Sequence, residues 1–183
     1  MSLIFNKKYI YNAGSMFNEA QQAARKNEGN ELRKMFPSFI VDNPIDTDEF
    51  KHERPTNKKI FEVDYNGVRD ADFVIFELDS NDSGTHMEFG LAVEQAINNK
   101  DKYLFAIVSD FRFKSGSFGN EIPGFGLNEM FSGAFFYEQL VKGEVPQIIV
   151  CDSHKSAREA IKAIVNNDTK DYLKQFDIKN IWK

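Results

Sequence analysis

The sequence predicts an α/β protein with a flavodoxin-like, or Rossmann-like, doubly wound sheet of five parallel strands. Its 183 residues suit one domain that buries a core. The segment FVIFEL at residues 73–78 is almost continuously apolar, which is typical of a parallel strand covered on both faces. Similar short runs alternate with helical stretches, and no repeat or linker interrupts them. We therefore expect residues 1–183 to form a single domain, with residues 169–183 as its C-terminal tail.

The first third of the chain is expected to form a strand, a helix and a second strand. Residues 8–13 (KYIYNA) favour a strand, and Gly14 breaks it. The polar, Ala-rich and Gln-rich residues 16–36 have helical spacing. Pro37 ends that helix, and the apolar residues 38–41 predict the second strand.

The middle of the chain is expected to continue this alternation. Residues 42–55 carry two prolines and no periodicity, so they predict a polar loop. A helix is expected over residues 56–71, and the central strand follows at 73–78. A polar turn at 79–84 then leads into a helix over residues 85–98.

The last part of the chain supplies two more strands. A buried strand is expected at residues 103–108 and the final strand at 147–151, followed by a helix over 153–166. Residues 111–133 are rich in Gly, Phe and Ser without a clear period, which predicts a long functional loop or lid. Residues 171–183 form a polar tail.

Composition excludes several classes of protein. A content of 42% hydrophobic and 28% charged residues excludes long-range disorder. The net charge of −5 makes extended nucleic acid an unfavourable ligand. The single Cys151 cannot form an intrachain disulfide, residues 1–6 are too short for a signal peptide, and no apolar run reaches membrane-span length. We expect a soluble, cytoplasmic protein.

The sequence offers no metal site and no cofactor site. Its three histidines, His52, His86 and His154, lack metal-ligand spacing. Gly14 and Gly84 are single glycines at strand-to-helix turns, so the glycine-rich cradle of dinucleotides and nucleoside triphosphates is missing. Cys151 is expected to be a small core residue rather than a nucleophile.

The densest polar cluster, DSNDSGTHMEFG at residues 79–90, follows the central strand, where this fold class places ligands. Two interpretations of it remain open, a ligand site or side chains with purely structural roles. Thr85 and Glu88 match a helix capping box, which would give Glu88 a structural role. Asp82 and Ser83 could equally bond their own backbone in a turn.

Asp64 is the most informative single carboxylate outside that cluster. On the expected helix it shares a face with the apolar Ile60, Val68 and Ala71. A buried, unpaired carboxylate costs several kcal/mol or takes up a proton. Asp64 therefore needs a partner or a pocket, unless the helix is rotated from this register.

Four segments, in this order, resemble the nucleoside 2′-deoxyribosyltransferases. They are Tyr11-Asn12-Ala13-Gly14, Asp64-Tyr65-Asn66-Gly67, Asp72-Phe73-Val74 and the block from Asp82 to Ala92, DSGTHMEFGLA. The resemblance implies a flavodoxin-like fold, no cofactor, and transfer of a 2-deoxyribosyl group between nucleobases through a covalent sugar on a glutamate. Its implied partners are deoxynucleosides and free nucleobases, and its implied assembly is a homohexamer of dimers.

The same resemblance assigns roles to individual residues. The nucleophile falls on Glu88, the base-facing carboxylates on Asp64 and Asp82, and the tyrosine that orients the nucleophile on Tyr11. The implied substrate contacts are Asn128, which would reach into a neighbouring subunit's site, and Gly14, Phe17, Asn43, Ser83 and Gly84. The chain departs from the family where Pro44 replaces a glutamine that commonly contacts the base, and where Lys183 follows the terminal aromatic Trp182.

The chemistry of these residue types fits glycosyl transfer. A carboxylate can stabilise the positive charge that develops on the sugar and then bond to it. Glu88, near a helix N-terminus, is expected to be favoured in its ionised form. A second carboxyl group, Asp64 or Asp82, would be kept protonated by burial or by a neighbouring like charge and would protonate the departing base.

Two alternatives stay open at this stage. A 2′-deoxynucleoside 5′-monophosphate N-glycosidase would use the same fold and glutamate with water as acceptor, and would need a phosphate site near Gly14, Ser15 or Ser83. A non-catalytic nucleotide- or flavin-binding module would use the acidic loop only as a binding surface.

Overall fold

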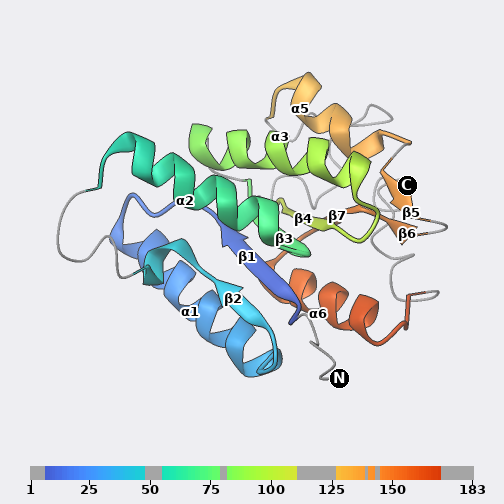
Figure 1. Ribbon diagram of the computed structural model, residues 1–183, viewed down its shortest axis with the longest axis horizontal. Helices are drawn as coiled ribbons and strands as arrows, with labels where there is room; N and C mark the ends of the chain where they lie inside the picture. Colours follow the sequence, from blue (N-terminus) through green and yellow to red (C-terminus); the bar gives the residue numbers. More distant parts are fainter. Residues whose placement is uncertain are drawn as a thin grey trace, which may run out of the picture.

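The computed structural model describes residues 7–47, 55–78, 82–110, 127–138, 140–142 and 145–169. Its centre is a sheet of five parallel strands in the order β2-β1-β3-β4-β7 (Figure 1). This order and the all-parallel pairing confirm the predicted doubly wound fold class. The strands are β1 (Tyr9–Ala13), β2 (Ile40–Asp42), β3 (Phe73–Glu77), β4 (Tyr103–Ile107) and β7 (Ile148–Cys151).

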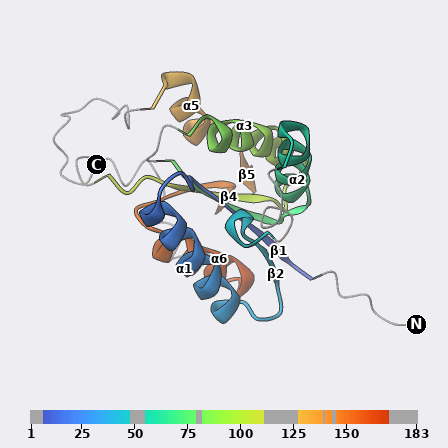
Figure 2. The same ribbon diagram turned by 90° about the vertical axis from the view of Figure 1, so that its left-hand side faces the viewer.

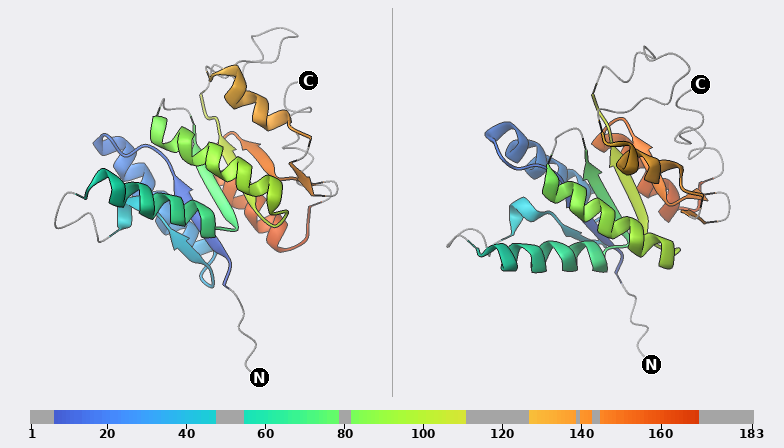
Figure 3. Two further views of the ribbon diagram at one scale, coloured as in Figure 1. Left: turned by 45° about the horizontal axis from the view of Figure 1, so that its top comes forward. Right: turned by 90° about the horizontal axis from the view of Figure 1, so that it is seen from above.

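Helices cover both faces of the sheet, as Figure 2 shows edge-on. Helices α1 (Glu19–Met35) and α6 (His154–Val165) cover one face. Helices α2 (Asn57–Asp70) and α3 (Ser83–Asn98) run side by side over the other, with the short helix α5 (Glu129–Gly133) next to α3 (Figure 3). The three layers bury an apolar core on each side of the sheet.

Strand β1 divides the two cores by simple alternation. Tyr11 and Ala13 belong to the core under α2 and α3, whereas Ile10 belongs to the core under α1 and α6. Asn12 is also fully buried, at 1% exposure. Neighbouring residues of β1 therefore point to opposite faces of the sheet.

The pairing of β1 positions the ligand edge of the sheet. β1 lies between β2 and β3, with Tyr11 paired to Asp42 on one side and to Val74 on the other. The chain crosses from one side of β1 to the other between β2 and β3, which makes this a topological switch point. In such sheets, ligands bind beyond the carboxyl ends of the strands at this point.

Helix starts follow from capping side chains. Asn18 and Gln21 form a reciprocal capping box at α1, and Thr56 and Ser153 cap α2 and α6. Helix α3 begins at Ser83, two residues before the predicted start, because Asp82 is its cap and accepts a hydrogen bond from the Gly84 amide. Thr85 lies inside the helix, so the predicted Thr85–Glu88 capping box is wrong.

Several short elements were not expected from the sequence. The predicted loop after β2 contains a 3₁₀ helix, η1 (Pro44–Asp46), and part of the predicted loop at 111–133 is helix α5. A further 3₁₀ helix, η3 (Ala134–Phe136), and the antiparallel strands β5 (Val141–Lys142) and β6 (Val145–Pro146) follow. The rest of that loop, at 111–126, and the tail at 171–183 lie outside the described residues.

At the amino ends of the strands, buried polar side chains donate hydrogen bonds to backbone carbonyls of the neighbouring loops and helix ends. The Lys102 ammonium, 1% exposed, donates to the carbonyls of Val68 (2.5 Å) and Ala71 (2.6 Å) at the end of α2. The Gln147 amide nitrogen lies 2.9 Å from the carbonyls of Ala96 and Lys102. Cys151 is buried in the core as predicted. Within the described ranges, the helices are all too short or too polar to cross a membrane.

Candidate active site

Three predicted residues from three different elements meet at one hydroxyl group. The Tyr11 hydroxyl, on β1, donates to Glu88 Oε1 on α3 at 2.7 Å. It lies 3.3 Å from Asp64 Oδ1 on α2. Because a phenol carries one proton, the shorter contact takes it, and a protonated Asp64 can donate to the Tyr11 oxygen. The site therefore joins two carboxyl groups through one hydroxyl.

A glycine on α2 makes this arrangement possible. The Tyr11 ring is 1% exposed and packs against Gly67, where an added Cβ would lie 2.5 Å from Tyr11 Cε2. A real Cβ essentially never approaches a heavy atom that closely. Gly67 thus lets α2 approach β1 closely enough for Asp64, one turn earlier, to reach the hydroxyl.

Glu88 occupies the second turn of α3, away from the helix cap. The pKa of its carboxyl is raised to about 8, with burial as the largest cause; the Tyr11 hydrogen bond lowers the pKa, and the nearby carboxylates Asp64, Asp82 and Asp42 add to the rise. The expectation that the helix terminus favours the ionised form is therefore wrong, since burial and like charges dominate. In the free protein at neutral pH, the protonated form of Glu88 is favoured.

Asp64 shows the predicted behaviour of a carboxylate on a buried helix face. Burial is the largest cause of its raised pKa, Asp42 and Asp82 raise it further, and the Tyr11 hydrogen bond opposes them. Val68 and Ala71 are buried as expected. Ile60 is 38% exposed, contrary to expectation, because only the C-terminal half of α2 packs on the sheet.

Asp82 closes the site at the start of α3. Its Oδ2 accepts a hydrogen bond from the Thr85 hydroxyl at 2.9 Å and lies 3.4 Å from Ser15 Oγ in the turn after β1. The carboxylate thus links the two strand-to-helix turns at the switch point. Ser83 and Gly84, predicted as substrate contacts, are exposed beside it.

The other predicted contacts have different surroundings. Phe17 is 76% exposed. Asn43 is buried, and its amide donates to the Arg25 carbonyl (3.0 Å) and to Asp46 (2.8 Å), so it fastens η1 to α1. Asn128 is exposed and caps α5 by accepting from the Met130 amide at 2.9 Å. Its role toward another subunit stays a prediction.

Sequence reasoning missed one carboxylate and one tyrosine at this site. The Tyr9 hydroxyl donates to Asp42 Oδ2 at 2.7 Å. Tyr9 and Tyr11 are two residues apart and therefore face the same side of β1, which is a signal that the sequence contains. Asp42 then adds a further negative charge beside Asp64 and Glu88.

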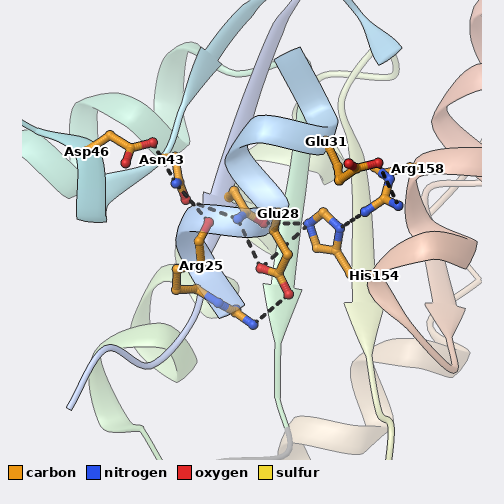
Figure 4. A network of polar contacts seen from close by, with 8 residues as sticks. Arg25, Glu28, Glu31, Asn43, Asp46, His154 and Arg158 are labelled. Carbon is orange, nitrogen blue, oxygen red and sulfur yellow. Dashed lines mark hydrogen bonds and ion pairs between the residues drawn. The ribbon is translucent and has the colours of Figure 1, made fainter. Parts of the chain in front are cut away.

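Apart from Asn43, the sequence did not point to a second polar network, which lies on the opposite sheet face (Figure 4). Arg25 pairs with Glu28 at 2.9 Å, and the partly buried His154 lies between Asn12 (3.1 Å) and Arg158 (2.8 Å). Arginine can only donate, so His154 Nδ1 is the acceptor and Nε2 carries the proton toward the Asn12 oxygen. Burial, with Arg158 and Arg25, lowers the pKa of His154 to about 3.

Among the described residues, no group of three or more His, Cys, Asp or Glu side chains could hold a metal ion. The four site carboxylates instead surround hydroxyl groups, from Tyr9, Tyr11, Ser15 and Thr85. Such a cluster can exchange protons and can offer a nucleophilic oxygen.

The sheet order defines a doubly wound α/β protein, and the carboxylates at its switch point form a candidate site on one side of β1. A family model described as nucleoside 2-deoxyribosyltransferase matches residues 10–130, which include Tyr11, Asp64 and Glu88. The chain belongs to the nucleoside 2-deoxyribosyltransferase family, which confirms the resemblance. No curated protein matches the chain.

The solved structures that share the fold include one from Enterococcus faecalis and one from Clostridium botulinum. A conserved protein from Enterococcus faecalis V583 is 20% identical, with a TM-score of 0.64, and the match covers 86% of this chain and 99% of that one. The CMP N-glycosidase BcmB of Clostridium botulinum is 14% identical, with a TM-score of 0.51 and the same coverage of 86% and 99%. These likenesses support the fold.

Proposed function

We propose that this protein is a nucleoside 2-deoxyribosyltransferase that exchanges the nucleobase of 2′-deoxynucleosides through a covalent 2-deoxyribosyl intermediate on Glu88. The observation that carries this proposal is the Tyr11 hydroxyl between Glu88 (2.7 Å) and Asp64 (3.3 Å). Glycosyl transfer with a covalent intermediate needs two carboxyl groups, one as nucleophile and one as proton donor. The site offers both on facing helices.

In the first half-reaction, the ionised Glu88 carboxylate attacks the anomeric carbon of the deoxyribose. A C–O bond forms as the glycosidic C–N bond breaks, and the electron pair of the broken bond leaves with the base. The positive charge that develops on the sugar is stabilised by the carboxylate before the bond is complete. The departing base becomes neutral when Asp64 donates its proton to a ring nitrogen.

Because the raised pKa of Glu88 favours its protonated form, Glu88 must lose its proton to another group before it can attack the sugar. Asp64 and Glu88 interact through Tyr11, so they titrate as a pair rather than separately. When the Tyr11 hydroxyl turns to donate to Asp64, a proton on Glu88 can pass to the Tyr11 oxygen while the Tyr11 proton passes to Asp64. This exchange leaves Glu88 ionised and Asp64 protonated, which are the two forms that the first half-reaction needs.

The second half-reaction reverses these roles. An incoming nucleobase attacks the anomeric carbon, Glu88 leaves as a carboxylate, and Asp64 accepts the proton that the base loses. No metal or cofactor takes part in these steps. Asp82 contributes by its negative charge, which favours the protonated forms of its two neighbours.

A second candidate activity is hydrolysis of a nucleoside 5′-monophosphate, with water replacing the incoming base. One observation favours it. The Arg25 guanidinium packs against the Gly14 turn, and its Nε and Nη1 are buried without a hydrogen-bond partner among the described residues. A guanidinium with spare donors beside the turn after β1 is suited to a 5′-phosphate, although its Nη2 already pairs with Glu28.

We also propose that Asn128 acts in a neighbouring subunit, as part of a homo-oligomer. Asn128 and Met130 are both exposed, Met130 at 90%, so α5 presents them to the outside of this chain. Light scattering of the active protein tests the assembly. A fully active monomer would exclude a role for Asn128 in another subunit.

One assay decides between the two activities. Purified protein is incubated with free adenine and either deoxyinosine, thymidine or one of their 5′-monophosphates, and the products are separated by chromatography. We expect deoxyadenosine to accumulate as the donor disappears. Free deoxyribose irrespective of added adenine would instead indicate a hydrolase, and cleavage of only the 5′-monophosphates would point to the Arg25 site.

A further inference from the structure

Asp42 is a carboxylate beside the site that the steps above do not use. It is the last residue of β2 and pairs in parallel register with Tyr11 on β1. Paired residues of neighbouring strands point to the same face of a sheet. Asp42 therefore lies on the face that α2 and α3 cover, next to Tyr11.

One hydrogen bond holds the Asp42 carboxylate, and its closeness to Gly67 locates it. The Tyr9 hydroxyl donates to its Oδ2 at 2.7 Å. A Cβ added at Gly67 would lie 3.1 Å from the same oxygen and 2.5 Å from the Tyr11 ring. The carboxylate thus lies beside Gly67 of α2, and Gly67 is one helical turn from Asp64 on that helix.

Three neighbouring elements each contribute one ionisable group beside Asp64 and Glu88. Tyr11 faces them from β1, Asp42 from β2, and Asp82 from the start of α3. Burial raises the pKa of both Tyr9 and Tyr11, so each is a neutral hydrogen-bond donor at physiological pH. The charges with the largest effect on Asp64 and Glu88 are therefore all negative.

We infer that Asp42 is a positioning residue of this site, held by Tyr9, and that its charge sets how many protons Asp64 and Glu88 share. The inference rests on the proposed function for its catalytic meaning. With the Asp42 charge present, the pair retains a proton near neutral pH, and that proton is available for the departing base. Tyr9 acts through Asp42, because its hydrogen bond keeps the Asp42 carboxylate directed toward α2.

The test is Asp42→Asn, which keeps the size of the side chain and removes its charge. Carboxyl ¹³C resonances of Asp64 and Glu88 are followed by NMR against pH in the free protein. We expect both titration midpoints to move to lower pH. In the exchange assay, both limbs of the pH profile should move in the same direction, by roughly half a pH unit. Asp42→Glu, which restores the charge, should move them back.

Glu62→Gln is the matched control, because it removes one negative charge from an exposed position on the same helix as Asp64. It should leave both titrations unchanged. Tyr9→Phe should give a smaller shift in the direction of Asp42→Asn. Unchanged carboxyl titrations in Asp42→Asn, or equal shifts in Glu62→Gln, would overturn the inference. Shifted titrations in a protein that lacks exchange activity would leave the electrostatic inference standing and refute the proposed function.

Discussion

Two consecutive residues of β1, Tyr11 and Asn12, lead into polar clusters of opposite character on the two sheet faces. On the α2/α3 face, Tyr11 meets carboxyl groups whose strongest charged neighbours are other carboxylates. On the α1/α6 face, Asn12 joins Glu28 and His154, and arginines balance the charge. The carboxyl groups Asp64 and Glu88 of the first cluster have raised pKa values and so retain protons. The second cluster is stabilised by ion pairs and hydrogen bonds.

The difference shows that burial alone does not mark a functional group. Glu28 and Glu88 are both partly buried acids with a raised pKa. Glu28 has Arg25 at 2.9 Å, and the positive charges of Arg25 and Arg158 lower its pKa against the effect of burial. Among the described residues, Glu88 has the Tyr11 hydroxyl to oppose burial and three like charges, and no cation beside it. An acid without a cation partner can change its protonation at modest cost, and this suits it to chemistry.

The largest expected effect comes from Glu88→Gln. This change keeps the shape and removes the attacking charge, so exchange activity should fall by roughly a thousandfold or more. Mass spectrometry of the wild type with a deoxynucleoside and no acceptor should show a 2-deoxyribosyl adduct on the Glu88 peptide. Glu28→Gln, on the opposite face, should retain activity. Full activity in the Glu88→Gln variant, or an adduct on another residue, would contradict the different roles given to Glu88 and Glu28.

Tyr11→Phe should have the next largest effect. It removes the hydroxyl that contacts both carboxyl groups and should slow exchange by about a hundredfold, as expected when a proton-transfer group is lost. Because the Tyr11 hydrogen bond lowers the pKa of both acids, the acid limb of the pH profile should move to higher pH. A profile that keeps its shape and position would show that Tyr11 only fills space.

Gly67→Ala tests the close approach of α2 to β1. The added Cβ would lie 2.5 Å from the Tyr11 ring, and relieving that overlap should cost about 1–3 kcal/mol of the free energy of unfolding. The control is Gly90→Ala on α3, where nothing lies within 4 Å of the added Cβ. That change should stabilise the helix by about 0.5–1 kcal/mol. Urea unfolding of both variants measures the difference, and equal effects would contradict the role given to Gly67.

The smallest expected effects concern how stability depends on pH. Glu88 and His154, on opposite faces of the sheet, should make contributions of opposite sign. The folded-state pKa of Glu88 is raised to about 8, so its contribution to stability is present at low pH and is lost as pH rises from about 4.5 to 8. The folded-state pKa of His154 is lowered to about 3, so its contribution is present above pH 6.5 and is lost as pH falls toward 3. Melting curves between pH 5 and 8 should show the first slope weakened in Glu88→Gln and the second weakened in His154→Gln. Parallel curves for wild type and both variants would contradict these assignments.

The fold was predictable because each strand and long helix carries its own local signal. Pro37 ends α1, and the apolar run of β3 identifies a central parallel strand. The start of α3 was placed two residues late because Asp82 and Thr85 are both good capping residues, and sequence alone does not say which one accepts the amide. The short hairpin of β5 and β6 was missed because strands of two residues show no periodicity.

The site was only partly predictable for a physical reason. Helical spacing placed Asp64 on a half-buried face, and the family resemblance grouped it with Glu88 and Tyr11. The network of Arg25, Glu28 and His154 could not be found in this way. Its members are ionisable residues on amphipathic helices, where such residues normally face solvent, and their partner Asn12 lies up to 142 residues away in the chain.

The distances along the chain between contacting site residues also bear on how the protein folds. The Tyr11–Glu88 contact closes 77 residues, and the five strands of the main sheet pair in parallel, so each pairing requires a crossover. Folding of such topologies is slow because loop entropy is lost before the contacts form. No local fragment holds both the hydroxyl and the carboxylate. During refolding, exchange activity should therefore return together with the complete sheet and not with early helix formation.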